Sequence, residues 1–135
     1  MIRWIGAWLA AAATFGVLDA AWLGAAYARL YRPELHAILA EHMRWAPAAL
    51  FYILYLTGLT IFAVAPALRA RRWATATVMG AIFGLVAYAT YDLTNQATLA
   101  IWSARVTSID LAWGAFASAA AATAGYFAGK SLRAG

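Results

Sequence analysis

Long apolar stretches alternate with short basic clusters along the whole chain. Each stretch contains at most one charged residue. Each also exceeds the roughly 20 residues that a helix needs to cross about 30 Å of hydrocarbon. Because backbone groups cannot stay unpaired in lipid and no alternating strand pattern occurs, the stretches are expected to be helices. The pattern predicts an all-α, four-helix transmembrane bundle in a single domain, 1–135, with spans at about 4–28, 46–68, 73–99 and 106–129.

The composition supports a lipid environment. Of the 135 residues, 66% are hydrophobic, only 11% are charged and none is cysteine. Soluble domains carry about 25% charged residues. A chain this short cannot hide such an apolar excess from water, because small domains leave much of their surface exposed. The composition excludes a soluble enzyme, a disordered tail and a disulfide-linked secreted domain.

The net charge of +5 is distributed as membrane topology signals, not as a nucleic-acid-binding face. With an even number of spans, both termini lie on one side of the membrane. Six basic residues belong to that side: Arg3, Arg69, Arg71, Arg72, Lys130 and Arg133. Four belong to the other: Arg29, Arg32, Arg44 and Arg105. The positive-inside rule therefore predicts a multi-pass inner-membrane protein with cytoplasmic termini.

Three of the five acids, Asp19, Asp92 and Asp110, fall inside the predicted spans. Acids in lipid are costly and mark functional sites by default. At a helical rise of about 1.5 Å per residue, they lie roughly 24, 30 and 30 Å from the cytoplasmic basic residues. We therefore expect the three carboxylates to meet near the outer face, within about 8 Å of one another. Protons, a bound cation, Arg105 or a cationic ligand would compensate their charge.

Helical spacing places further polar and aromatic side chains around these acids. The predicted pocket consists of Asp19, Asp92, Asn95 and Asp110, with Tyr52, Tyr55, Tyr88, Trp22 and Trp113 as its lining. The alternative is structural: each aspartate would cap or hydrogen-bond a neighbouring helix near the headgroups.

The first loop and the glycines complete the candidate features. The segment 31–44 reads as a short amphipathic helix on the membrane surface, with Leu35, Ile38, Leu39 and Met43 as its apolar stripe. His36 and His42 are six residues apart and lie on different faces, so metal ligation by them is a minor alternative. The pairs Gly80/Gly84 and Gly125/Gly129 allow close helix packing, either within the chain or against a second copy or membrane partner.

The whole chain resembles a bacterial family of four-span membrane proteins, domain of unknown function 2177. Four segments carry the resemblance: 18–24 (LDAAWLG), 47–55 (PAALFYILY), 91–95 (YDLTN) and 110–114 (DLAWG). The resemblance implies an integral membrane protein without an assigned activity. It supplies no roles for the three acids, although they lie in its motifs.

Three functions remain open from the sequence. The first is binding, or translocation, of a proton, a cation or a small cationic ligand at the acids. The second is a membrane-embedded enzyme acting on a lipid or lipid-soluble substrate, with an aspartate as acid, base or metal ligand. The third is an accessory subunit whose aspartates are structural. No cofactor is identified, and no phosphate-binding, nucleophile-elbow or zinc-protease motif occurs.

The topology prediction can be checked with compartment reporters. A fusion at Leu39 is expected to report the periplasm, and a fusion at the C-terminus the cytoplasm, because more basic residues lie on the side of the termini. A cytoplasmic signal from Leu39 would invert the topology and move the acids to the inner side.

Overall fold

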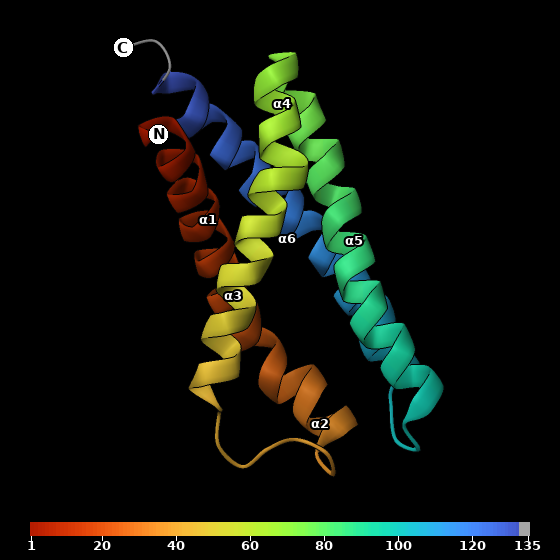
Figure 1. Cartoon of the computed structure of the whole chain (residues 1–135). Helices are drawn as coiled ribbons and strands as arrows, with labels where there is room; N and C mark the ends of the chain where they lie inside the picture. Colours follow the sequence, from red (N-terminus) through yellow and green to blue (C-terminus); the bar gives the residue numbers. More distant parts are fainter. Residues whose placement is uncertain (133–135) are drawn as a thin grey trace.

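The computed structural model describes residues 1–132, so Arg133 lies outside the described residues. Within that range the chain is helical and contains no strand. The helical elements, in chain order, are α1 (Ile2–Ala26), η1 (Tyr27–Tyr31), α2 (Arg32–Leu35), α3 (Trp45–Leu59), η2 (Thr60–Val64), α4 (Ala65–Ala70), α5 (Trp73–Thr98) and α6 (Ala104–Ser131). They run up and down, with the N-terminus, the α4–α5 turn and the end of α6 at one end of the molecule (Figure 1).

Within residues 1–132, three continuous helical segments are long and apolar enough to cross a membrane: Ile2–Leu35, Trp45–Ala70 and Trp73–Thr98. Helix α6 has 28 residues but is not one of these three. It packs against both α5 and α1, and it has more buried residues than any other element. Alanine, glycine, serine and threonine make up more than half of α6, and these small side chains suit close packing against its neighbours.

Two π-helical turns allow prolines inside continuous helices. Pro33 and Pro66 each lie just after such a turn, η1 and η2 respectively. A proline ring clashes with the carbonyl four residues earlier, and that residue, Arg29 or Phe62, belongs to the wide turn in each case. The helix that contains Pro66 is therefore not interrupted there. The helix continues to Ala70 and ends at Arg71, which adopts a left-handed conformation at φ 53°.

The structure does not confirm a separate amphipathic helix over 31–44. The first helix continues through η1 to Leu35, and the chain then forms turns and bends up to Arg44. Leu35 is buried in a small cluster with Leu30 and Val106, which covers this end of the bundle. Ile38 and Met43 of the expected stripe remain exposed, because the chain after Leu35 turns back toward α3.

Small residues fix the register between the antiparallel helices α5 and α6. A Cβ atom added at Gly80 would lie 2.7 Å from the Cβ of Ala122, and one at Gly84 would meet Gly114 and Ser118. Tyr88 lies against Gly114 in the same way. The helices are antiparallel, so moving four residues forward along α5 brings the contact point about four residues back along α6. Continuing this register places Asp92 opposite Asp110.

The glycine pairs are consequently not surfaces for a partner, contrary to one of the sequence expectations. Gly80 and Gly84 are buried against α6. Gly125 faces Ala7 and Val64, and Gly129 faces Leu68 and Ala7. All four positions are occupied by contacts within this chain, because the helices approach closely where side chains are absent.

The register predicts the cost of adding one methyl group. Gly84→Ala should destabilise the protein by about 1–3 kcal/mol, because the new Cβ would meet backbone atoms of Gly114 that cannot move independently. Gly16→Ala is the matched control, since nothing lies within 4 Å of the position that its new Cβ would take and alanine is the better helix former. Thermal unfolding in detergent measures both. Equal melting temperatures for the two variants would contradict the register.

Candidate functional site

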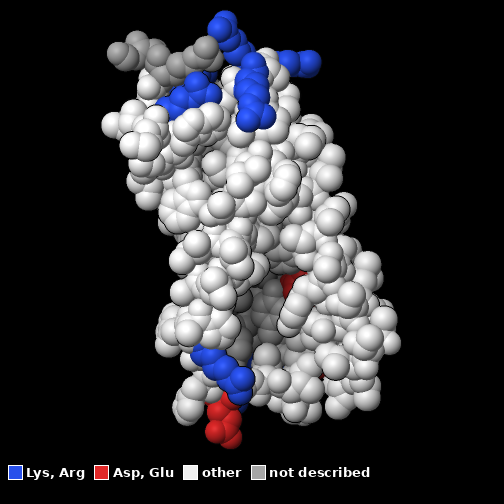
Figure 2. All heavy atoms as spheres, viewed as in Figure 1, with Lys and Arg blue, Asp and Glu red and all other residues white. Residues whose placement is uncertain are grey.

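A pocket of about 410 Å³ opens between α3 and α5, with α6 behind it. Its lining consists of Phe51 and Tyr55 from α3, Ala87, Tyr88, Tyr91 and Asp92 from α5, and Asp110 from α6. Helix α5 packs against η2 and α4, and it diverges from α3 toward the end opposite the N-terminus (Figure 1). The space-filling view shows a hollow in that half of the molecule with acidic atoms in its wall (Figure 2).

Asp92 has no solvent exposure, and neither of its carboxylate oxygens has a hydrogen-bond partner among the described residues. Buried polar groups in proteins are nearly always hydrogen-bonded, so each exception needs a reason. The only ion pair within residues 1–132 joins Arg105 to Glu34 at 3.6 Å. The idea that Arg105 neutralises the acids is therefore wrong: its guanidinium is taken by an acid at the end of the first helix.

Asp110 differs from Asp92 because it has a defined partner. The Tyr31 hydroxyl donates a hydrogen bond to Asp110 Oδ1 at 2.5 Å. Tyr31 in turn accepts a hydrogen bond from Trp22 Nε1 at 2.8 Å. The Trp22 ring stacks on Trp113 with centroids 4.6 Å apart. These linked contacts hold Asp110 Oδ1 in place. The other carboxylate oxygen, Oδ2, is left without a partner from this network.

Asp19 lies on α1, outside the pocket lining. The Tyr52 hydroxyl donates a hydrogen bond to Asp19 Oδ2, which links α3 to α1. One helical turn further along α3, the Tyr55 hydroxyl and Ser118 Oγ are 2.5 Å apart and share a hydrogen bond. Each of these tyrosines therefore fastens α3 to another helix. Of the three acids, Asp92 and Asp110 line the pocket together, and Asp19 is held beside it.

Among the remaining candidates, Asn95 is half-buried and lies outside the pocket lining. Both histidines are exposed. No group of three or more histidine, aspartate or glutamate side chains within residues 1–132 is placed to hold a metal ion.

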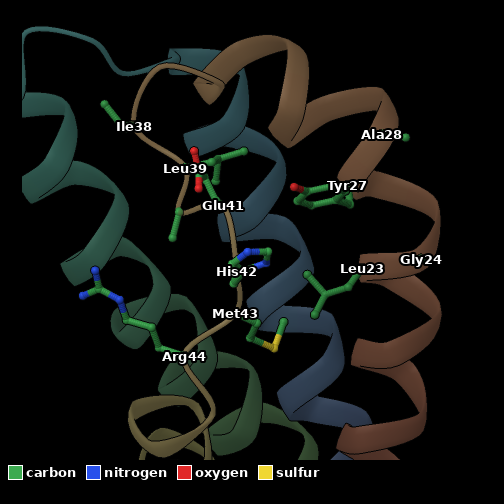
Figure 3. A pocket seen from close by; sticks show the side chains of 11 residues that line it. Leu23, Gly24, Tyr27, Ala28, Ile38, Leu39, Glu41, His42, Met43 and Arg44 are labelled. Carbon is green, nitrogen blue, oxygen red and sulfur yellow. The ribbon is translucent and has the colours of Figure 1, made fainter.

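A second pocket, of about 920 Å³, lies between the first helix and the loop after Leu35. His42 belongs to its lining and His36 does not, so the two histidines are not brought together there. Figure 3 shows His42 and Met43 on the side of the loop that faces Leu23. The walls are mainly apolar, and none of the three intrahelical acids reaches this pocket.

One comparison with known proteins identifies the family. The family model described as predicted membrane protein (DUF2177) matches residues 4–127. The chain belongs to this family. The resemblance that the sequence indicated is thereby confirmed, and this DUF2177 protein is a membrane protein with apolar helices. No curated protein and no solved structure matches the chain.

Sequence reasoning missed four residues in or beside the pocket. Phe51 and Tyr91 line it, Tyr31 is hydrogen-bonded to Asp110, and Ser118 is hydrogen-bonded to Tyr55. Ser118 carried a usable signal, since it lies two helical turns after Asp110 on the same face of α6. Tyr31 carried none, because the π turn η1 shifts the helical register after Ala26. Phe51 and Tyr91 are rim residues, 45% and 61% exposed, and became visible only with the pocket.

The Tyr31 hydroxyl connects Trp22 to Asp110, so its removal should be costly. Tyr31→Phe should destabilise the protein by about 1–3 kcal/mol, because it removes a partner from a buried carboxylate and from an indole N–H. The control is Tyr27→Phe, at a tyrosine that is 49% exposed and makes no side-chain hydrogen bond within residues 1–132. Denaturation in detergent compares them. If both variants unfold like the unmodified chain, the contact chain to Asp110 does not stabilise the fold.

Proposed function

We propose that this chain is a four-span inner-membrane protein with cytoplasmic termini, and that its Asp92–Asp110 pocket binds a cation. In this arrangement α6 is the fourth span. Its 28 residues are long enough to cross hydrocarbon, and α1 and α5 cover its polar face. The basic residues at the end of the molecule that carries the N-terminus and the α4–α5 turn support the orientation (Figure 2). The pocket then opens in the outer half of the bundle.

The unpartnered carboxylate of Asp92 carries the proposal for binding. An isolated charge in an apolar interior is unstable unless it is paired or takes up a proton. The side chains that line the pocket include two carboxylates and no basic group. A cation that enters the pocket supplies the missing partner and reaches both acids from one position. Asp110 is already anchored by Tyr31, so it provides a fixed second charge beside the unpartnered one.

Binding is favoured over translocation because the core beyond the acids is packed. Phe15, Leu59 and Val64 have no solvent exposure and belong to the main hydrophobic core of the helices. Small residues close the α5–α6 interface along the same stretch. Transporters place their sites near the midplane between two accessible sides. This pocket opens on one side.

The role of Asp92 predicts two opposite effects of one substitution. Asp92→Asn keeps the size of the side chain and removes the charge, so the melting temperature without added cation should stay level or rise. The same substitution should abolish stabilisation by cations, since a ligand of the folded state stabilises by mass action only where it binds. Thermal unfolding in detergent is measured over a series of sodium, potassium and tetramethylammonium chloride concentrations.

Glu41→Gln serves as the control, because Glu41 is an exposed acid outside this pocket. It should respond to each salt as the unmodified chain does. The proposal fails if no salt stabilises the unmodified chain more than Asp92→Asn. A loss of about 3–5 kcal/mol in salt-free Asp92→Asn would instead assign the aspartate to a structural ion pair.

A further inference from the structure

The residues that line the Asp92 pocket restrict the class of its ligand more than the two acids alone do. Both oxygens of Asp92 are buried without a partner, so the ligand must present positive charge or hydrogen-bond donors at the floor. Above the floor, four of the seven lining residues are aromatic: Phe51, Tyr55, Tyr88 and Tyr91. The faces of aromatic rings attract cations, most strongly where water is excluded.

The rings form a connected wall. Tyr55 contacts Phe51 at 5.2 Å and Tyr88 at 6.4 Å between ring centroids, with the second pair edge to face. Tyr88, on α5, also lies against Gly114, which holds its ring against α6. Tyr91 at the rim contacts Trp102 at 5.6 Å. These contacts hold the rings in position without any ligand present.

Size distinguishes an organic cation from a bare ion. The pocket volume of about 410 Å³ lies within the range of about 300–1,000 Å³ typical of small-molecule sites. It exceeds the roughly 30 Å³ that one water molecule occupies by more than tenfold. No cluster of three or more metal-ligating acids or histidines lies within residues 1–132. An alkali or divalent ion would therefore leave most of its coordination to water.

The solvent exposure of the lining residues increases from the floor of the pocket to its rim. At the floor, Asp92 and Asp110 are 0% and 7% exposed, and Tyr55 is 6% exposed. At the rim, Phe51 and Tyr91 are largely exposed between the diverging helices α3 and α5 (Figure 1). A ligand with a charged head and an apolar body fits this order, with its head on the acids and its body between the rim rings.

We propose that the ligand class is an organic ammonium ion, whose nitrogen lies between Asp92 and Asp110 and whose carbon substituents contact the aromatic wall. This rests on the cation site proposed above and specifies its ligand. The rim opens sideways between two helices, so the ammonium group can belong to a soluble amine or to the headgroup of an amine-bearing lipid.

The test is isothermal titration of the full chain in detergent with tetramethylammonium, with potassium and with the neutral alcohol 3,3-dimethylbutan-1-ol. Tetramethylammonium should bind at least about tenfold more tightly than potassium, and the alcohol should not compete. Asp92→Asn should weaken tetramethylammonium binding about tenfold or more. Tyr91→Leu should weaken it by about two- to thirtyfold and leave potassium unaffected, because the ring at the rim contacts only the organic cation.

Phe127→Leu is the control for Tyr91→Leu, since Phe127 is an exposed ring at the opposite end of α6. It should bind as the unmodified chain does. If potassium or sodium binds in an Asp92-dependent way and tetramethylammonium does not, the ammonium inference is overturned and the cation site stands. If no cation binds, both are overturned.

Lipid composition separates the two sources of the ammonium group. The titration is repeated in nanodiscs of phosphatidylglycerol alone and of phosphatidylglycerol with phosphatidylethanolamine. A weaker apparent affinity for tetramethylammonium with the amine lipid, absent in Asp92→Asn, supports a lipid headgroup as ligand. Equal affinity in both nanodiscs supports a soluble amine.

Discussion

The close approach of α5 and α6 is the constraint on which the rest of the molecule depends. Glycine and other small residues at every fourth position let the two backbones approach closely. In lipid, where the hydrophobic effect does not drive helix association, van der Waals packing at this interface holds the helices together. This α5–α6 interface fixes the register of the two helices, and the register places Tyr88 against Gly114 and Asp92 opposite Asp110. A shift of one helical turn would separate the acids.

The α5–α6 interface also explains why Asp92 can stay without a hydrogen-bond partner. Asp19 and Asp110 each accept a hydrogen bond from a tyrosine on another helical segment. Asp92 projects from the tightly packed α5 at the level where α3 has diverged, and no donor reaches it within residues 1–132. A buried carboxylate in this state makes the fold less stable than a fully paired one would be. The proposed ligand supplies that missing interaction.

Much of this arrangement could be predicted from single-helix periodicity. The stripe from Gly80 to Asp92 is visible in the sequence at steps of four, and the distances of Asp92 and Asp110 from the basic residues place them at one depth. Periodicity failed where the helix changes its geometry. The π turn η1 shifts the helical register after Ala26, so that the Tyr31 hydroxyl reaches Asp110. Which face covers the glycines depends on tertiary packing, so no local pattern could assign them to this chain or to a partner.

Cross-linking tests the register of α5 and α6 directly. The sequence has no native cysteine, so only the introduced cysteines can react. Cysteines are introduced in pairs into the chain in native membranes and treated with a short bifunctional thiol reagent. The pair at Asp92 and Asp110 should cross-link within one chain. The pair at Asp92 and Ser108 should not, because Ser108 is exposed on another face of α6. Efficient cross-linking of Asp92 to Ser108, with none to Asp110, would contradict the placement of the two acids in one pocket.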